Sequence, residues 1–252
     1  DQGDLGSLIP DVPWDQFLDA FGLPGPGYLV SVTTPFFEEL GPILDSVPVA
    51  DWKLYLRWQI LNAQASRLTR ALDDRDFEFY GKALRGSEEQ RPDWKRAVAV
   101  VDEGLGELVG KVYVEKHFPP EAKERMDVLV ANLVKAYQDS VKALDWMSEE
   151  TKAEALDKLS KFEPKIGYPK TFRQYDGVTV AENDYFGNRM RIREANVERD
   201  IRRHGGPVDR DEWGMNPQTV NAYYTPVLNQ IVFPAAILQP PFFDRSADEA
   251  IN

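Results

Sequence analysis

The chain has 252 residues, of which 42% are hydrophobic, so it can bury a core as one large domain or as two small ones. Its formal net charge of -12 repels phosphate backbones and anionic membrane surfaces, which argues against a nucleic acid as partner. The sequence contains no cysteine, and this excludes disulfides, thiolate nucleophiles and cysteine-ligated zinc.

These 252 residues themselves contain no predicted targeting segment. No apolar run is long enough to span a bilayer, and the first residues lack the basic and apolar regions of a signal peptide. We therefore expect a soluble protein without a membrane segment, and its compartment, cytoplasmic or secreted, stays open. The first residues read as a chain entered partway, so we expect further residues to precede them.

Helix signals dominate the first 160 or so residues. Proline at the start, glycine or proline after the end, and apolar residues three or four apart mark each segment. The predicted helices span residues 12–21, 34–47, 51 onward, 77–84 and 91–110, with an extension over 112–118. The helix from residue 51 carries one apolar stripe, which we expect to face a core. This stripe consists of Trp52, Leu56, Ile60 and Ala63.

The clearest helix opens at Pro119-Pro120 and has a long apolar face. Core packing explains this face better than a cofactor groove does. Its members are Met126, Val130, Leu133, Tyr137, Val141 and Leu144. Ser148 is a suitable N-cap for the following helix, which we expect to end near Phe162. Up to that point the sequence predicts no strand.

The character of the chain changes at Gly167, where aromatic and β-branched residues mix with turn residues before a charged helix over about 181–203. The alternation over 220–224 and the apolar run Ile231-Val232-Phe233, separated by a turn, then predict a β-hairpin. Residues 235–238 look like the start of a short helix. We place the lobe boundary at Gly167, so that a helical lobe spans residues 1–166 and a second, partly β lobe spans residues 167–252.

Evidence for catalysis by the chain's own residues is weak. His117 and His204 are the two histidines, and neither lies in an HxxxH or HxH spacing. The acidic run around Asp73 lacks the glycine and distal glutamate of a calcium loop. No serine lies in a nucleophile-elbow pattern, and the glycine clusters lack the features of a phosphate loop.

Three stretches carry a family resemblance. They are NAYYTPVLNQIVFPAAILQPPFF over 221–243, WMSEETKAEALDKLSKFEPKIGYP over 146–169, and DEWGMNPQTVNAYY over 211–224. They closely resemble the neprilysin family of zinc metallopeptidases, peptidase family M13, which includes endothelin-converting enzyme and bacterial oligoendopeptidase O. The resemblance implies a mainly α fold, in which a helical lobe is followed by the first, partly β part of a thermolysin-like catalytic lobe. Ala236 replaces the family's usual glycine.

The resemblance also implies a function for the complete enzyme. Zinc would be its cofactor, held by an HExxH motif that this sequence lacks, so we expect an internal part that ends before the motif and supplies no catalytic residue and no metal ligand. The chain would instead bind the peptide substrate. Asn221, Ala222 and Tyr223 match the substrate-binding strand, and Ile237 and Phe242 match the pocket for a hydrophobic residue after the scissile bond.

Two partners follow from this interpretation: small peptide substrates and a companion chain that carries HExxH. Such a chain would dock on residues 231–243, whose apolar side chains we expect to face water. The helical lobe would roof the substrate cavity. The alternative function is a non-catalytic helical module that binds peptides or a partner through the same edge strand.

Overall fold

The computed structural model describes residues 6–10, 12–23, 25, 30 and 33–252. Its contacts separate two compact units. Unit 1 comprises Asp1–Asp93 and Val178–Pro207, and unit 2 comprises Trp94–Gly177 and Val208–Asn252. The lobe boundary predicted at residues 166 and 167 refers to a complete enzyme and stays a prediction.

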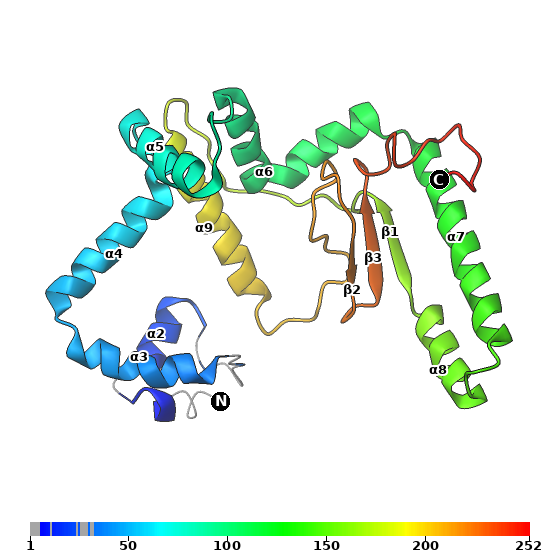
Figure 1. Ribbon diagram of the computed structural model, residues 1–252, viewed down its shortest axis with the longest axis horizontal. Helices are drawn as coiled ribbons and strands as arrows, with labels where there is room; N and C mark the ends of the chain where they lie inside the picture. The colour runs from blue at the N-terminus through cyan, green and yellow to red at the C-terminus, as the bar shows by residue number, and fades with distance from the viewer. Residues whose placement is uncertain (1–5, 11, 24, 26–29, 31–32) are drawn as a thin grey trace. The chain divides into compact units, whose positions relative to one another are not determined.

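Unit 1 consists of helices over the part that the structure describes (Figure 1). Its elements are α2 (Trp14–Ala20), α3 (Thr34–Ser46), α4 (Val49–Gln64), the 3-10 turn η1 (Ala65–Arg67), α5 (Arg70–Asp76), the π-helix η2 (Phe77–Ala83) and α9 (Tyr185–Arg203). The predicted helices are therefore confirmed to within a few residues. α9 begins where the sequence places a good cap, because the Asp184 carboxylate accepts a hydrogen bond from the Gly187 N–H at 3.1 Å.

The apolar stripe of α4 does not face a core. Leu56 is 54% exposed and Ile60 is 68% exposed, and no residue of α4 is buried. The prediction of a core-facing stripe is wrong for this chain, because periodicity shows that one face is apolar but not which segment covers it.

Unit 2 contains three helices and the sheet. Its helices are α6 (Asp93–His117), α7 (Pro120–Ala143) and α8 (Glu149–Ser160). α6 joins the predicted helix over 91–110 and its extension into one helix that bends at Leu105, where the dihedral angles leave the helical region (Figure 1). Ser148 caps α8 as predicted, since its hydroxyl accepts the Thr151 N–H at 3.2 Å.

Three strands form one sheet in the order β1-β3-β2 (Figure 1). β1 (Glu163–Gly167) pairs parallel with β3 (Gln230–Pro234), and β2 (Tyr223–Thr225) pairs antiparallel with β3, with Tyr224 opposite Ile231. The predicted hairpin is confirmed. As expected, no strand precedes residue 162 in the described part of the chain. β1, which begins at Glu163, was not predicted, because Pro164 and two charged residues hide its pattern. An edge strand tolerates such a proline.

The segment after β3 is a turn rather than the start of a helix. The Ile237 N–H donates to the Pro234 carbonyl at 3.2 Å, and the Leu238 N–H donates to the Ala235 carbonyl at 3.2 Å. Each of these bonds spans three residues and closes a single turn, and no helix is formed over 235–238. The prediction of a short helix over 235–238 is therefore wrong.

The core of unit 2 lies between α7 and the sheet. Its buried members are Phe118, Ala122, Met126, Val130, Ile166, Ala235, Leu238 and Phe243. The first half of the apolar face of α7 is thus core, as predicted, whereas Leu133 and Tyr137 further along are exposed.

This core corrects one expectation about residues 231–243. Val232 and Ala235 are both fully buried, and Phe243 is 4% exposed, so most apolar side chains of the segment are covered by this chain itself. They are not available as the docking surface predicted for a companion chain. Their covering helix, α7, lies about a hundred residues earlier in the sequence, which local patterns cannot reveal.

Candidate functional site

β2 is an edge strand of the three-stranded sheet. It pairs with β3 on one side, and in the described part of the chain no strand pairs with its other side. Such an edge presents unpaired N–H and C=O groups, to which an extended peptide can add as a further strand. Asn221 and Ala222 lie just before β2, and Tyr223 is its first residue.

The Asn221 side chain is exposed at the entrance to this strand. The Asn221 Oδ1 accepts the Ala222 N–H at 2.8 Å, and the main-chain N–H of Asn221 donates to the Thr219 carbonyl at 3.0 Å. These bonds fix the residue locally. The amide Nδ2 has no hydrogen-bond partner among the described residues, so its two donors are available to a ligand.

Tyr223 has a different role in the structure. Its hydroxyl accepts the Gly214 N–H at 2.7 Å, which ties the start of β2 to the preceding loop. Burial raises the pKa of the Tyr223 phenol, and the nearby Glu212 carboxylate adds to the effect. The side chain is thus used within the fold, and contact with a ligand would come from the main chain.

Ile237 and Phe242 lie in the turn region after β3. Ile237 is half-buried and packs against the core of unit 2, whereas Phe242 is 61% exposed. Phe243, its neighbour, is buried in the core. The turn therefore anchors one aromatic ring and presents the other at the surface.

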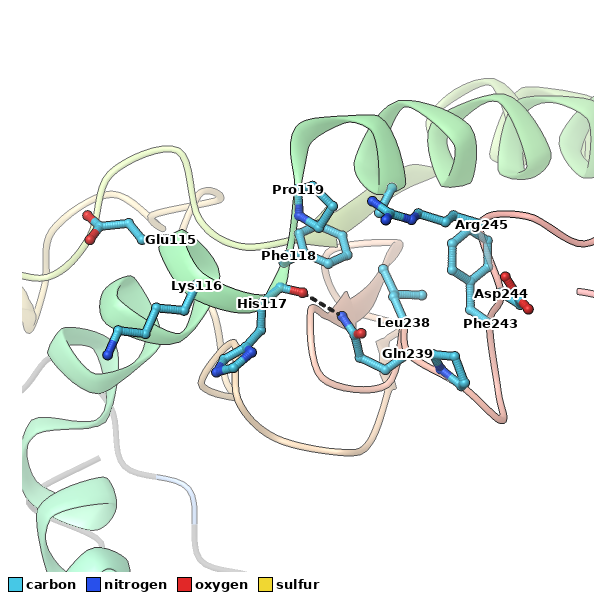
Figure 2. A pocket seen from close by; sticks show the side chains of 12 residues that line it. Glu115, Lys116, His117, Phe118, Pro119, Leu238, Gln239, Phe243, Asp244 and Arg245 are labelled. Atoms are coloured by element: carbon cyan, nitrogen blue, oxygen red, sulfur yellow. Dashed lines mark hydrogen bonds between the residues drawn. The ribbon is translucent and has the colours of Figure 1, made fainter.

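A cavity of about 450 Å³ opens beside this turn, between the end of α6 and the start of α7 (Figure 2). Phe118, Leu238 and Phe243 form its apolar wall, and the Gln239 Nε2 donates to the His117 carbonyl at 3.1 Å across it. Neither Ile237 nor Phe242 lines this cavity. The resemblance alone pointed to that pair, and no sequence signal marked the cavity.

A second hollow, of about 340 Å³, has an apolar lining. It is formed by Met126, Val130, Leu133, Val134, Tyr137, Leu159, Phe162, Ile231 and Phe233. These side chains come from α7, the end of α8, Phe162 after it, and β3. They account for the exposed second half of the apolar face of α7.

Two buried polar side chains hold the loop that leads to β2. Lys165 is 7% exposed, and its ammonium donates to the Arg210 carbonyl and, at 3.2 Å, to the Glu212 carbonyl. Burial lowers the pKa of this lysine, and the Glu163 carboxylate opposes the shift. Gln230 is 1% exposed and donates to Glu163 at 2.7 Å and to the Arg210 carbonyl at 2.9 Å. Sequence reasoning did not single out either residue.

The described residues do not form a metal centre or a membrane span. No group of three or more His, Asp or Glu side chains among them is arranged to hold a metal ion. His117 ends α6 with its ring 5.1 Å from the Tyr113 ring, and His204 is the C-cap of α9. Within the same residues, every helix is too short or too polar to cross a bilayer.

Comparison with known proteins gives concordant matches. Two family models described as Peptidase family M13 match, one over residues 1–169 and the other over residues 221–252. Neprilysin-3 of Drosophila melanogaster is 33% identical over 266 residues, covering 98% of this chain and 34% of that protein. The endothelin-converting enzyme homolog of Locusta migratoria is 33% identical over 205 residues, covering 79% of this chain and 28% of that protein.

A solved structure shares the fold. The zinc metalloprotease ZMP1 of Mycobacterium tuberculosis, in complex with an inhibitor, superposes with a TM-score of 0.89 and 46% sequence identity. The match covers 98% of this chain and 38% of that one. The predicted mainly α fold is confirmed. This chain spans about a third of the length of the curated relatives that it matches.

Proposed function

This chain belongs to peptidase family M13, and from that premise we propose that it is the substrate-binding part of a zinc-dependent metalloendopeptidase. The complete enzyme would hydrolyse peptide bonds of small peptides and prefer a hydrophobic residue after the scissile bond. The observation that carries the proposal is the edge strand β2 with the free amide donors of Asn221 at its entrance.

Strand addition explains how this edge would hold a substrate. The Asn221 Nδ2 would donate to a carbonyl of the peptide, and the Ala222 carbonyl would accept an N–H from it. Such contacts engage the main chain, so they hold peptides of different sequence in one register. The local bond from Ala222 N–H to Asn221 Oδ1 supports this role, because it fixes the direction in which Nδ2 points.

The turn after β3 would supply selectivity. Ile237 rests against the core and is rigid, and Phe242 presents its ring to solvent. Both are apolar, and an apolar wall favours hydrophobic side chains. The helical part of the chain would roof the cavity in the complete enzyme and restrict access to small peptides.

The residues of this chain do not fit a zinc site. They include two histidines, and the described part of the chain shows no cluster of ligands. Zinc ligands, the catalytic base and the HExxH motif would therefore lie outside the chain, either in the rest of the same polypeptide or in a companion chain. Alone, this chain should neither hold stoichiometric zinc nor cleave peptides.

The test uses the full-length protein that contains this chain. Incubated with a mixture of short peptides, it should cleave them, lose activity when a chelator removes the metal and regain it when zinc is added back. Metal analysis should show about one zinc per polypeptide in the active form. Tight peptide binding without cleavage, unaffected by the chelator, would instead support a non-catalytic binding module.

A further inference from the structure

The loop before Asn221 is seated on the bend of α6 by two side-chain amides. The Asn216 Nδ2 donates to the Asp102 carbonyl at 3.3 Å. The Gln218 Nε2 donates to the Gly106 carbonyl at 2.9 Å and to the Asp102 carboxylate. Between them, Pro217 is buried to less than 2% exposure. We call Asn216–Gln218 the clamp.

The clamp contacts α6 at the bend of this helix. Leu105 has φ -126° and ψ 30°, which lie outside the helical region and mark the bend. The two carbonyls that accept from the clamp, those of Asp102 and Gly106, lie on either side of Leu105. The side-chain amides of the clamp therefore hold the main chain of α6 on both sides of the bend.

Two glycines of α6 make room for the clamp. A Cβ on Gly106 would lie 2.7 Å from the Asn216 Oδ1 and closer still to its Nδ2. A Cβ on Gly110 would lie 2.5 Å from the Pro217 Cδ and 2.8 Å from the Gln218 Oε1. Real Cβ atoms essentially never come this close to another heavy atom, so a larger residue at Gly106 or Gly110 would displace the loop.

The clamp also reaches both elements that would contact a substrate. The Pro217 carbonyl accepts the Ala236 N–H at 2.9 Å, next to Ile237. In the other direction, the Thr219 N–H donates to the Asn216 carbonyl at 2.9 Å, and the Asn221 N–H donates to the Thr219 carbonyl at 3.0 Å. Two main-chain hydrogen bonds thus separate the clamp from Asn221.

We propose that the clamp, seated on Gly106 and Gly110, positions both substrate-binding elements, the entrance of β2 and the turn after β3. This inference rests on the proposed function. Clamp residues are positioning residues, because they act through Asn221 and Ile237 and would not touch the peptide. The Gln218 Oε1 is buried and has no hydrogen-bond partner among the described residues, so the two bonds donated by Nε2 are what hold this side chain on α6.

The test is a double-mutant cycle in the zinc-loaded full-length enzyme. Gln218→Glu keeps the shape of the side chain but removes both donated bonds and opposes the Asp102 carboxylate. We expect kcat/KM for peptides to fall about tenfold with zinc content unchanged. In the Asn221→Ala background the same substitution should lower kcat/KM by a smaller factor than in the parent, because one of the two contacts that the clamp positions is already lost.

Two further variants separate positioning from general damage. Asp102→Asn combined with Gln218→Glu returns a donor and an acceptor to the pair, but not the bond to the Gly106 carbonyl, so it should restore part of the lost kcat/KM. Gln138→Glu makes the same chemical change on α7, away from the clamp, and should leave kcat/KM unchanged. Strictly additive effects of Gln218→Glu and Asn221→Ala, or a parental kcat/KM for Gln218→Glu, would overturn the inference.

The proposed function can fail separately. A parent protein that binds peptides without cleaving them contradicts the peptidase assignment. In that case the double-mutant cycle is repeated with the peptide Kd in place of kcat/KM, and the same outcomes support or overturn the inference. A parent that neither binds nor cleaves peptides overturns both.

Discussion

At the scale of single residues, this structure uses polar side chains inside its core to hold the loop that leads to the candidate site. Lys165 is an example: a lysine beside a proline is expected at the surface, yet its ammonium is buried on two carbonyls of the loop. The sequence cannot predict this, because the partners are about 45 residues away. In contrast, the family resemblance pointed to Asn221 from the sequence alone, but it did not predict the hydrogen bond between the Asn221 side chain and the Ala222 N–H.

A residue-scale prediction concerns Phe242. Phe242→Ala in the full-length enzyme should lower kcat/KM about tenfold for peptides with Leu or Phe after the scissile bond, because an apolar wall of the pocket is removed. Peptides with Ala at that position should change by less than about threefold. Stability should change little, since the ring is 61% exposed.

The matched control for Phe242 is Phe79→Ala, which removes a ring of similar exposure, 54%, from η2 in unit 1. It should leave the preference among peptides unchanged. An equal loss for all peptides with Phe242→Ala, whatever residue follows the scissile bond, would remove Phe242 from the selectivity pocket.

At the scale of elements, the sequence predicted those helices and turns that neighbouring residues encode. Capping residues and apolar spacing located the helices, and the turn between two β-rich runs located the hairpin β2–β3. β1 was missed because its sequence, EPKIG, lacks alternation and its pairing with β3 spans more than 60 residues. The stripe of α4 shows the same limit, because an apolar face carries no information about the segment that covers it.

An element-scale prediction concerns how pH affects the sheet. The hydrogen bond from Gln230, and after it the Arg210 guanidinium, holds the pKa of Glu163 below its ordinary value of 4.5, and burial opposes the shift. A carboxylate whose folded pKa is lowered adds stability above its unfolded pKa and loses it as pH falls through the folded pKa. Stability of unit 2 should therefore decline below about pH 4.5.

Glu163→Gln should remove this part of the pH dependence. It should lower the denaturation midpoint at pH 6 and approach the parent as pH falls below the ordinary pKa, as measured by chemical denaturation of the full-length protein. Glu124→Gln, an exposed carboxylate on α7, is the control and should follow the parent at every pH. Parallel curves for Glu163→Gln and the parent across this range would show that Glu163 does not contribute through its charge.

At the scale of the whole molecule, this chain provides an edge strand, a turn after β3 and helices, but no cluster of metal ligands among its described residues. Its relatives are about three times as long, and ZMP1 of Mycobacterium tuberculosis is named a zinc metalloprotease. In the proposed enzyme, β2 would therefore have to meet a metal site contributed from outside the chain. The absence of an HExxH motif from the sequence predicts that the metal ligands lie elsewhere. The geometry at the entrance of β2 could be learned only from the structure.

The most direct test of this account compares Asn221→Ala, Asn221→Asp and Asn132→Ala in the zinc-loaded full-length enzyme. Asn221→Ala should lower kcat/KM about ten- to a hundredfold, which corresponds to about 1–3 kcal/mol for lost substrate-directed hydrogen bonds, with zinc content unchanged. Asn221→Asp keeps the acceptor for the Ala222 N–H but loses the Nδ2 donors, so it should lose as much. Asn132→Ala, on the exposed side of α7, should match the parent. Parental kcat/KM for both Asn221 variants would contradict the claim that this chain supplies the substrate-binding strand.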